Sequence, residues 1–119
     1  MISKELLNKV LNIEIVSYQM KQKNILAYEY NKVSKNQWSG KTFCNRSINI
    51  YELAHKCKEW ASTHNYSVKS GWEMTHWGGA YRVEVFRNSN NILFSMSTVD
   101  TEPEAIFKAC QWILDKELA

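Results

Sequence analysis

The sequence predicts an α+β fold with a mainly antiparallel sheet and helices on its faces. Three segments carry apolar residues at helical spacing, and short strand-like runs occur in groups between them. The connections between neighbouring runs are short and rich in turn-forming residues, as in hairpins. Strands joined in this way pair antiparallel, whereas strands that alternate with helices form parallel sheets. The expected order is helix, two strands, helix, three strands, helix (α-β-β-α-β-β-β-α).

The first helix is expected over residues 3–11. Ser3 is suited to begin it, because a serine hydroxyl can accept a hydrogen bond from a free backbone N–H of the first turn. An apolar stripe follows at helical spacing, made of Leu6, Leu7, Val10 and Leu11. This stripe is expected to pack against the rest of the fold.

Two strand-like runs, residues 13–20 and 24–30, follow the first helix. A polar turn connects them, so we expect an antiparallel hairpin. Residues 31–47 are polar and irregular, and they carry basic side chains around two aromatic residues. No regular element is expected there.

The second half of the chain predicts a helix, three strands and a helix. Asn49 and Glu52 form a capping-box pattern at the start of the second helix, and Asn65 is suited to end it. Thr101 and Glu104 form the same pattern at the start of the last helix. The strands between these helices are expected over residues 66–74, 81–87 and 92–97.

The 119 residues are expected to form a single domain. Residues 1–47 would supply the N-terminal helix, hairpin and basic loop, and residues 48–118 an α-β-β-β-α module. No apolar run has the length of a membrane-spanning helix, and the charged first residues lack the apolar core of a signal peptide. We therefore expect a cytoplasmic protein that makes no membrane contact.

The net charge of +3 is unevenly distributed. Residues 1–60 hold ten basic and five acidic side chains, whereas residues 61–119 hold five basic and seven acidic side chains. An anionic partner would therefore meet the N-terminal half. The residues expected to contact a nucleic acid are Lys21, Lys23, Lys32, Lys35, Lys41 and Arg46.

Sequence motifs for catalysis and metal binding are missing. None of the three histidines has a partner at ligand spacing, and the three cysteines include no Cys-x-x-Cys pair. The chain also lacks the glycine-rich loops that bind phosphates and the Gly-x-Ser-x-Gly motif of serine hydrolases. We therefore expect neither an enzyme nor a bound metal or cofactor.

Five tryptophans are the most informative residues for function. Trp60, Trp72 and Trp112 fall on predicted helices and strands, where core packing is expected. Trp38 and Trp77 fall in predicted loops, where an exposed indole is suited to contact a partner. The candidate partner-binding residues are Trp38, Trp77, Lys32, Lys35, Lys41, Arg46 and His76.

A set of features within residues 48–118 resembles a known family. They are the helix over residues 51–60, the strand over residues 81–86 with alternating Arg82 and Glu84, and the stretch from Thr101 to Ile106 followed by Ala109 and Cys110. In these features the chain is similar to the phage ABA sandwich domain family of small phage and prophage proteins. The resemblance implies a fold and a phage origin, and it brings no established activity or site residues.

Three functions remain open from the sequence. The first is a non-enzymatic, phage-derived accessory protein that binds a host macromolecule, with inhibition of a host defence system such as CRISPR-Cas as its specific form. Because the chain is mildly basic, such an inhibitor would block a surface of a host protein and would not mimic DNA. The second is a nucleic-acid-binding module that uses the basic N-terminal half. The third is a structural homodimer in which a second copy completes a sheet edge or an apolar helix face.

Overall fold

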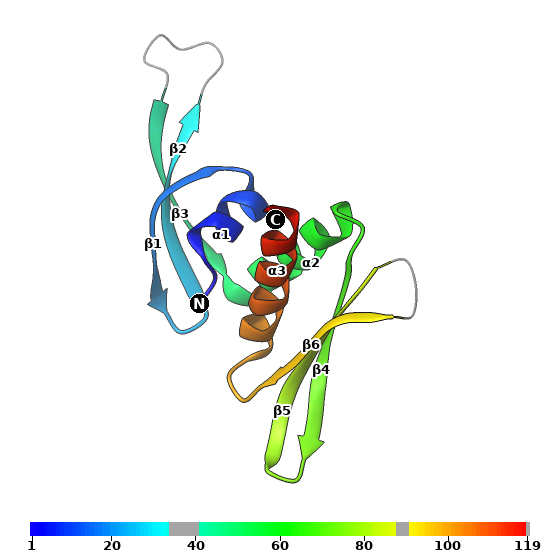
Figure 1. Cartoon of the computed structure of the whole chain (residues 1–119). Helices are drawn as coiled ribbons and strands as arrows, with labels where there is room; N and C mark the ends of the chain where they lie inside the picture. Colours follow the sequence, from blue (N-terminus) through cyan, green and yellow to red (C-terminus); the bar gives the residue numbers. More distant parts are fainter. Residues whose placement is uncertain (34–40, 88–90, 119) are drawn as a thin grey trace.

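The computed structural model describes residues 1–33, 41–87 and 91–118, and these ranges form an α+β fold. Three helices lie between two three-stranded antiparallel sheets (Figure 1). The elements are α1 (Lys4–Leu11), β1 (Glu14–Gln22), β2 (Ile25–Val33), β3 (Lys41–Asn49), α2 (Ile50–Thr63), β4 (Ser67–Thr75), β5 (Gly78–Phe86), β6 (Ile92–Thr98) and α3 (Glu102–Leu118).

The N-terminal sheet has the strand order β1-β2-β3. In its central strand, Leu26, Tyr28 and Tyr30 are buried, whereas Ala27 and Glu29 between them are partly exposed. Alternating side chains of a strand point to opposite faces, so one face of this sheet is packed and the other is open. Helix α1 packs against β1 and helix α2 against β3, which places the packed face toward the helices.

Strand β3 and the end of β2 lie in the segment of residues 31–47 that was expected to be irregular. Strand β3 pairs with β2 from Val33 and Lys41 to Ile25 and Asn49 without a shift in register. Its sequence is mostly polar, with few of the β-branched and aromatic residues that favour strands. This segment forms a strand because it pairs with β2 and because Ile48 is buried. Both contacts are non-local, so the sequence of the segment alone does not reveal them.

The C-terminal sheet has the strand order β4-β5-β6, and α3 packs across all three strands. Val68, Val83 and Val85 are buried on the face that the helix covers. Phe94 of β6 adds a partly buried ring, which stacks on Trp112 of α3 with ring centroids 5.4 Å apart. The α2 helix also contacts β4, so both long helices cover this sheet.

The α+β class, the antiparallel pairing and the order of the expected elements are confirmed. The structure adds β3 and divides the strands between two sheets, where a single sheet with helices on its faces was expected. Each sheet has one apolar face, so each is covered on one side, and the same helical layer covers both.

Side chains identified in the sequence cap all three helices. The Ser3 hydroxyl accepts a hydrogen bond from the Leu6 N–H at 3.2 Å, and the Asn49 side chain accepts one from Tyr51 at 2.8 Å. The Thr101 hydroxyl accepts one from the Glu104 N–H at 3.3 Å. These short-range contacts satisfy N–H groups that a helix leaves free, which explains why the helix starts could be predicted locally.

Two cysteines lie where α2 packs on α3. Cys57 and Cys110 are fully buried, and the thiol of Cys110 donates a hydrogen bond to the Cys57 carbonyl oxygen at 3.5 Å. A hydrogen bond with Cys110, together with burial, raises the pKa of the Cys57 thiol. Because the thiolate is the reactive form, Cys57 should be inert at neutral pH.

Thiol titration of the folded protein tests this packing. With Ellman's reagent at pH 8, we expect Cys44, which is partly exposed, to react first, and Cys57 and Cys110 to react only after unfolding in guanidinium. The Cys44→Ser variant should lack the fast phase. A fast reaction of more than one thiol in the folded protein would contradict the buried helix contact.

Candidate functional site

The turn between β4 and β5 exposes the indole of Trp77. Its side chain is 97% exposed, and the neighbouring His76 is also exposed. Thr75 holds the turn, because its hydroxyl donates to the Gly78 carbonyl at 2.6 Å and accepts from the Trp77 N–H at 3.2 Å. The indole is therefore presented on an ordered backbone.

Trp72 was expected in the core, and this prediction is wrong. On the face of β4 that points toward the helices, Val68 is buried, Ser70 is partly buried, Trp72 is 60% exposed and Met74 is 72% exposed. Exposure rises along the strand because the β4–β5 hairpin extends beyond the ends of the helices (Figure 1). None of the described helices covers Trp72 and Met74, which lie nearest the β4–β5 turn on this face.

The exposed Trp72 ring is nevertheless fixed by its neighbours. It meets the ring of Tyr81, directly opposite on β5, edge to face, with centroids 4.9 Å apart and planes at 71°. It also lies over Gly79, where a Cβ atom would overlap the indole. We use the name aromatic tip for Trp72, Met74 and Tyr81 on this face together with Trp77 of the adjoining turn.

The opposite face of the same hairpin is charged. Arg82 lies between two carboxylates, with its Nη1 atom 3.6 Å from Glu73 Oε2 and its Nε atom 3.8 Å from Glu84 Oε1. Lys69 lies nearer the start of β4, and its Nζ atom is 5.0 Å from the centroid of the Phe86 ring. The hairpin thus has an apolar side and a side of mutually neutralised charges.

The remaining candidate residues lie on the N-terminal sheet or outside the described residues. Arg46 is exposed on β3, and the register pairs Lys32 with Thr42 and Lys41 with Val33 at the far end of the β2–β3 pair. This end and the β4–β5 turn lie at opposite ends of the molecule (Figure 1). The structure therefore separates Arg46, Lys32 and Lys41 from His76 and Trp77. Two candidates, Trp38 and Lys35, lie outside the described residues.

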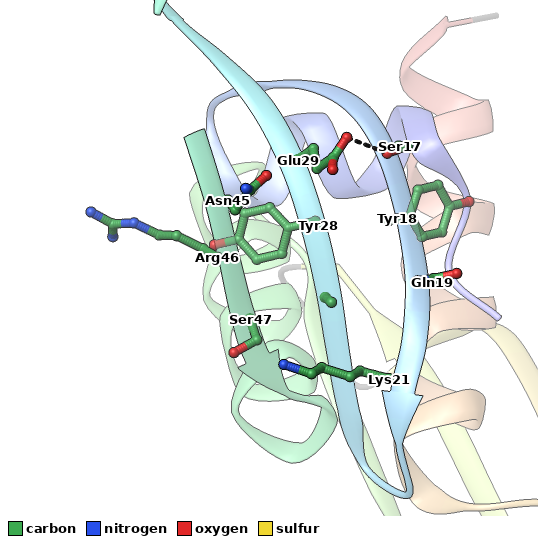
Figure 2. Close-up of a pocket in the computed structure, with 10 residues that line it drawn as sticks. Ser17, Tyr18, Gln19, Lys21, Tyr28, Glu29, Asn45, Arg46 and Ser47 are labelled. Atoms are coloured by element: carbon green, nitrogen blue, oxygen red, sulfur yellow. Dashed lines mark hydrogen bonds between the residues drawn. The ribbon is translucent and has the colours of Figure 1, made fainter. Parts of the chain in front are cut away.

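A second surface feature is a hollow of about 440 Å³ on the open face of the N-terminal sheet. Figure 2 shows polar side chains from all three strands around the hollow, and Ala27 also belongs to its lining. Ser17 donates a hydrogen bond to Glu29 at 3.0 Å across β1 and β2. We call this feature the outer hollow; its polar lining includes Ser17, Gln19, Lys21, Glu29, Asn45, Arg46 and Ser47.

Two tyrosines also line the outer hollow, and both are already engaged. The Tyr18 hydroxyl donates to the Ile2 carbonyl oxygen at 3.0 Å. Tyr28 is buried, and this burial raises the pKa of its phenol, although Arg46, directly opposite on β3, lowers it in part. At neutral pH the Tyr28 side chain is therefore uncharged.

Histidine and acidic side chains make isolated contacts in the described ranges. His55 pairs with Glu59 at 2.9 Å on an exposed face of α2, and the His64 ring packs on Trp60 with centroids 4.7 Å apart. Among the described residues, no three His, Cys, Asp or Glu side chains gather as a metal-binding group. No helix in these ranges is long and apolar enough to cross a membrane.

Comparisons of the chain with protein-family models, with curated proteins and with solved structures give no match.

Substitution of two glycines tests the geometry of the aromatic tip. In Gly79→Ala the added methyl group would occupy the place of the Trp72 ring, so we expect the ring to move away from Tyr81. Because the displaced group is an exposed side chain, the loss of stability should be small, about 1 kcal/mol or less. The indole N–H resonance of Trp72, assigned by Trp72→Phe, should shift in the NMR spectrum.

Gly71→Ala is the matched control. A Cβ atom at Gly71 meets no atom within 4 Å, so this variant should leave the Trp72 resonance unchanged. Equal shifts in both variants, or none in Gly79→Ala, would contradict the position of the Trp72 ring.

Proposed function

We propose that this chain is a non-enzymatic, phage-derived binding protein that attaches to a host protein through the aromatic tip. The observation that carries the proposal is the exposure of Trp72, Met74 and Trp77 at the end of one hairpin. Large apolar side chains that gather on a surface are typical of interaction sites. Tryptophan and tyrosine also dominate the residues that contribute most to protein–protein affinity.

The fixed position of Trp72 supports the same proposal. An exposed side chain that is free to rotate loses conformational entropy when a partner binds it. Trp72 is already held by Tyr81 and by its contact over Gly79, so little of this cost remains. A rigid aromatic surface is therefore better suited to tight binding than a mobile one.

The charge of the chain limits how it would inhibit a host protein. A mimic of DNA needs a strongly acidic surface, whereas this chain carries +3. As an inhibitor of a host defence system such as CRISPR-Cas, it would cover a protein surface or hold the target in an inactive arrangement. The proposed place of action is the cytoplasm of the bacterial host.

Affinity capture from a bacterial host lysate treated with nuclease tests this proposal. We expect the wild-type chain to retain a specific protein, and the Trp72→Ala and Trp77→Ala variants to lose it. Truncating an aromatic side chain at the centre of an interface costs about 2 kcal/mol or more, which weakens binding about thirtyfold. The affinity for the identified protein can then be measured by calorimetry.

Tyr51→Ala is the matched control, since Tyr51 is an aromatic residue on α2 with 51% exposure and lies outside the aromatic tip. This variant should retain the partner. The proposal fails if the double variant Trp72→Ala/Trp77→Ala captures the same protein as the wild type, or if nothing remains bound after nuclease treatment.

A second copy of the chain is the alternative occupant of the aromatic tip. In that case light scattering would give twice the mass of 14.0 kDa, and Trp77→Ala would restore the monomer mass. A monomer mass for the wild-type chain would leave a host protein as the occupant.

A further inference from the structure

Strand β6 forms a free edge of the C-terminal sheet. The sheet has the order β4-β5-β6, so β6 pairs with β5 on one side only. Beyond this pairing, β6 makes no backbone hydrogen bond to another element within the part of the chain that the structure describes. An edge strand of this kind presents a row of N–H and C=O groups with which a further strand can pair.

The edge formed by β6 carries no charge. Residues 88–99 are the longest run of the chain without Asp, Glu, Lys or Arg, and β6 lies within this run. The other edge strands of the two sheets, β1, β3 and β4, all carry acidic or basic side chains. Natural proteins use charged side chains and proline to keep sheet edges from pairing, and β6 has neither.

A β-bulge interrupts only the start of β6. Phe94 pairs with Val85 and Ile92 with Phe86, so Leu93 is the extra residue of this bulge. From Phe94 to Thr98 the register with β5 is continuous. A bulge turns an edge away from a further strand, and this one leaves the stretch from Phe94 to Thr98 regular.

Apolar side chains of this regular stretch remain partly exposed. Phe94 and Met96 lie on the face that α3 covers, and both are only partly buried. The residues opposite them on the central strand, Val85 and Val83, are fully buried. A strand beside β6 would cover the exposed parts of Phe94 and Met96, which is favourable because it removes apolar surface from water. The edge therefore offers apolar contacts as well as free backbone groups.

The lack of charge favours a second copy of the chain as the added strand. When a strand pairs with its own copy, a charged residue near the centre lies close to the same charge on the other copy, and like charges opposite each other destabilise a sheet. An uncharged strand avoids this repulsion in any register. Two-fold pairing also uses both β6 edges, so association stops at two copies.

We infer that β6 pairs antiparallel with β6 of a second copy and joins the two C-terminal sheets into one continuous sheet. Centred on Met96, the middle of the regular stretch, this pairing places Ser95 opposite Ser97 of the second copy, and Phe94 opposite Thr98. The exposed tryptophans of the aromatic tip lie on β4 and its turn, across β5 from this edge. The inferred dimer is therefore separate from the proposed attachment to a host protein and does not depend on it.

Light scattering of charged variants tests the inference. We expect the wild-type chain to give twice the mass of 14.0 kDa. Ser95→Lys/Ser97→Lys places like charges opposite each other across the two copies, so it should give the monomer mass. Both serines are exposed, so the single chain should keep its fold, and circular dichroism would verify this.

Ser95→Lys/Ser97→Glu is the matched control at the same two positions. In the inferred pairing it places each introduced lysine opposite an introduced glutamate of the second copy, so it should keep the dimer mass. Ser67→Lys, an exposed position on the other edge strand β4, should also keep it. Trp72→Ala/Trp77→Ala should remain a dimer as well, which separates this edge from the aromatic tip.

Any of three results would overturn the inference. The first is a monomer mass for the wild-type chain at about 1 mM, which would leave the edge to a strand of a different protein. The second is a dimer mass that Ser95→Lys/Ser97→Lys leaves unchanged or that Trp72→Ala/Trp77→Ala abolishes, since the contact would then lie elsewhere. The third is a monomer mass for Ser95→Lys/Ser97→Glu, which would contradict the antiparallel pairing.

Discussion

The packing of α2 on α3 is the constraint on which both sheets depend. Each three-stranded sheet has one apolar face, and such a face is stabilised by burial against another layer of secondary structure. Helices α1 and α2 cover the N-terminal sheet, α2 and α3 cover the C-terminal sheet, and small side chains such as Ala61, Ala109 and Cys110 are fully buried where the helices pack. A loosened helix contact would therefore expose the inner faces of two sheets at once.

Local features of the fold could be predicted from the sequence, whereas several non-local ones could not. Ser3, Asn49 and Thr101 begin helices through contacts within three residues, and such contacts are visible in the sequence. Strand β3 depends on its register with β2, and its own residues do not indicate a strand. The division into two sheets likewise depends on how the helices pack.

The candidate sites show the same difference. The exposure of Trp77 follows from its position in a turn, so the sequence was sufficient. The exposure of Trp72 depends on where the helices end relative to the β4–β5 hairpin, which the alternation of its strand does not contain. Lys21 was among the basic residues identified in the sequence, yet its place in the lining of the outer hollow depends on the pairing of β1 with β2.

The two faces of the β4–β5 hairpin have opposite effects on self-association. Exposed tryptophans at the end of a hairpin favour self-association, especially at high protein concentration. On the reverse face, Arg82 and its two glutamates keep a row of hydrated groups that a second hairpin would have to dehydrate before stacking there. The charged face thus disfavours self-association of the hairpin, while the apolar face stays accessible to a partner.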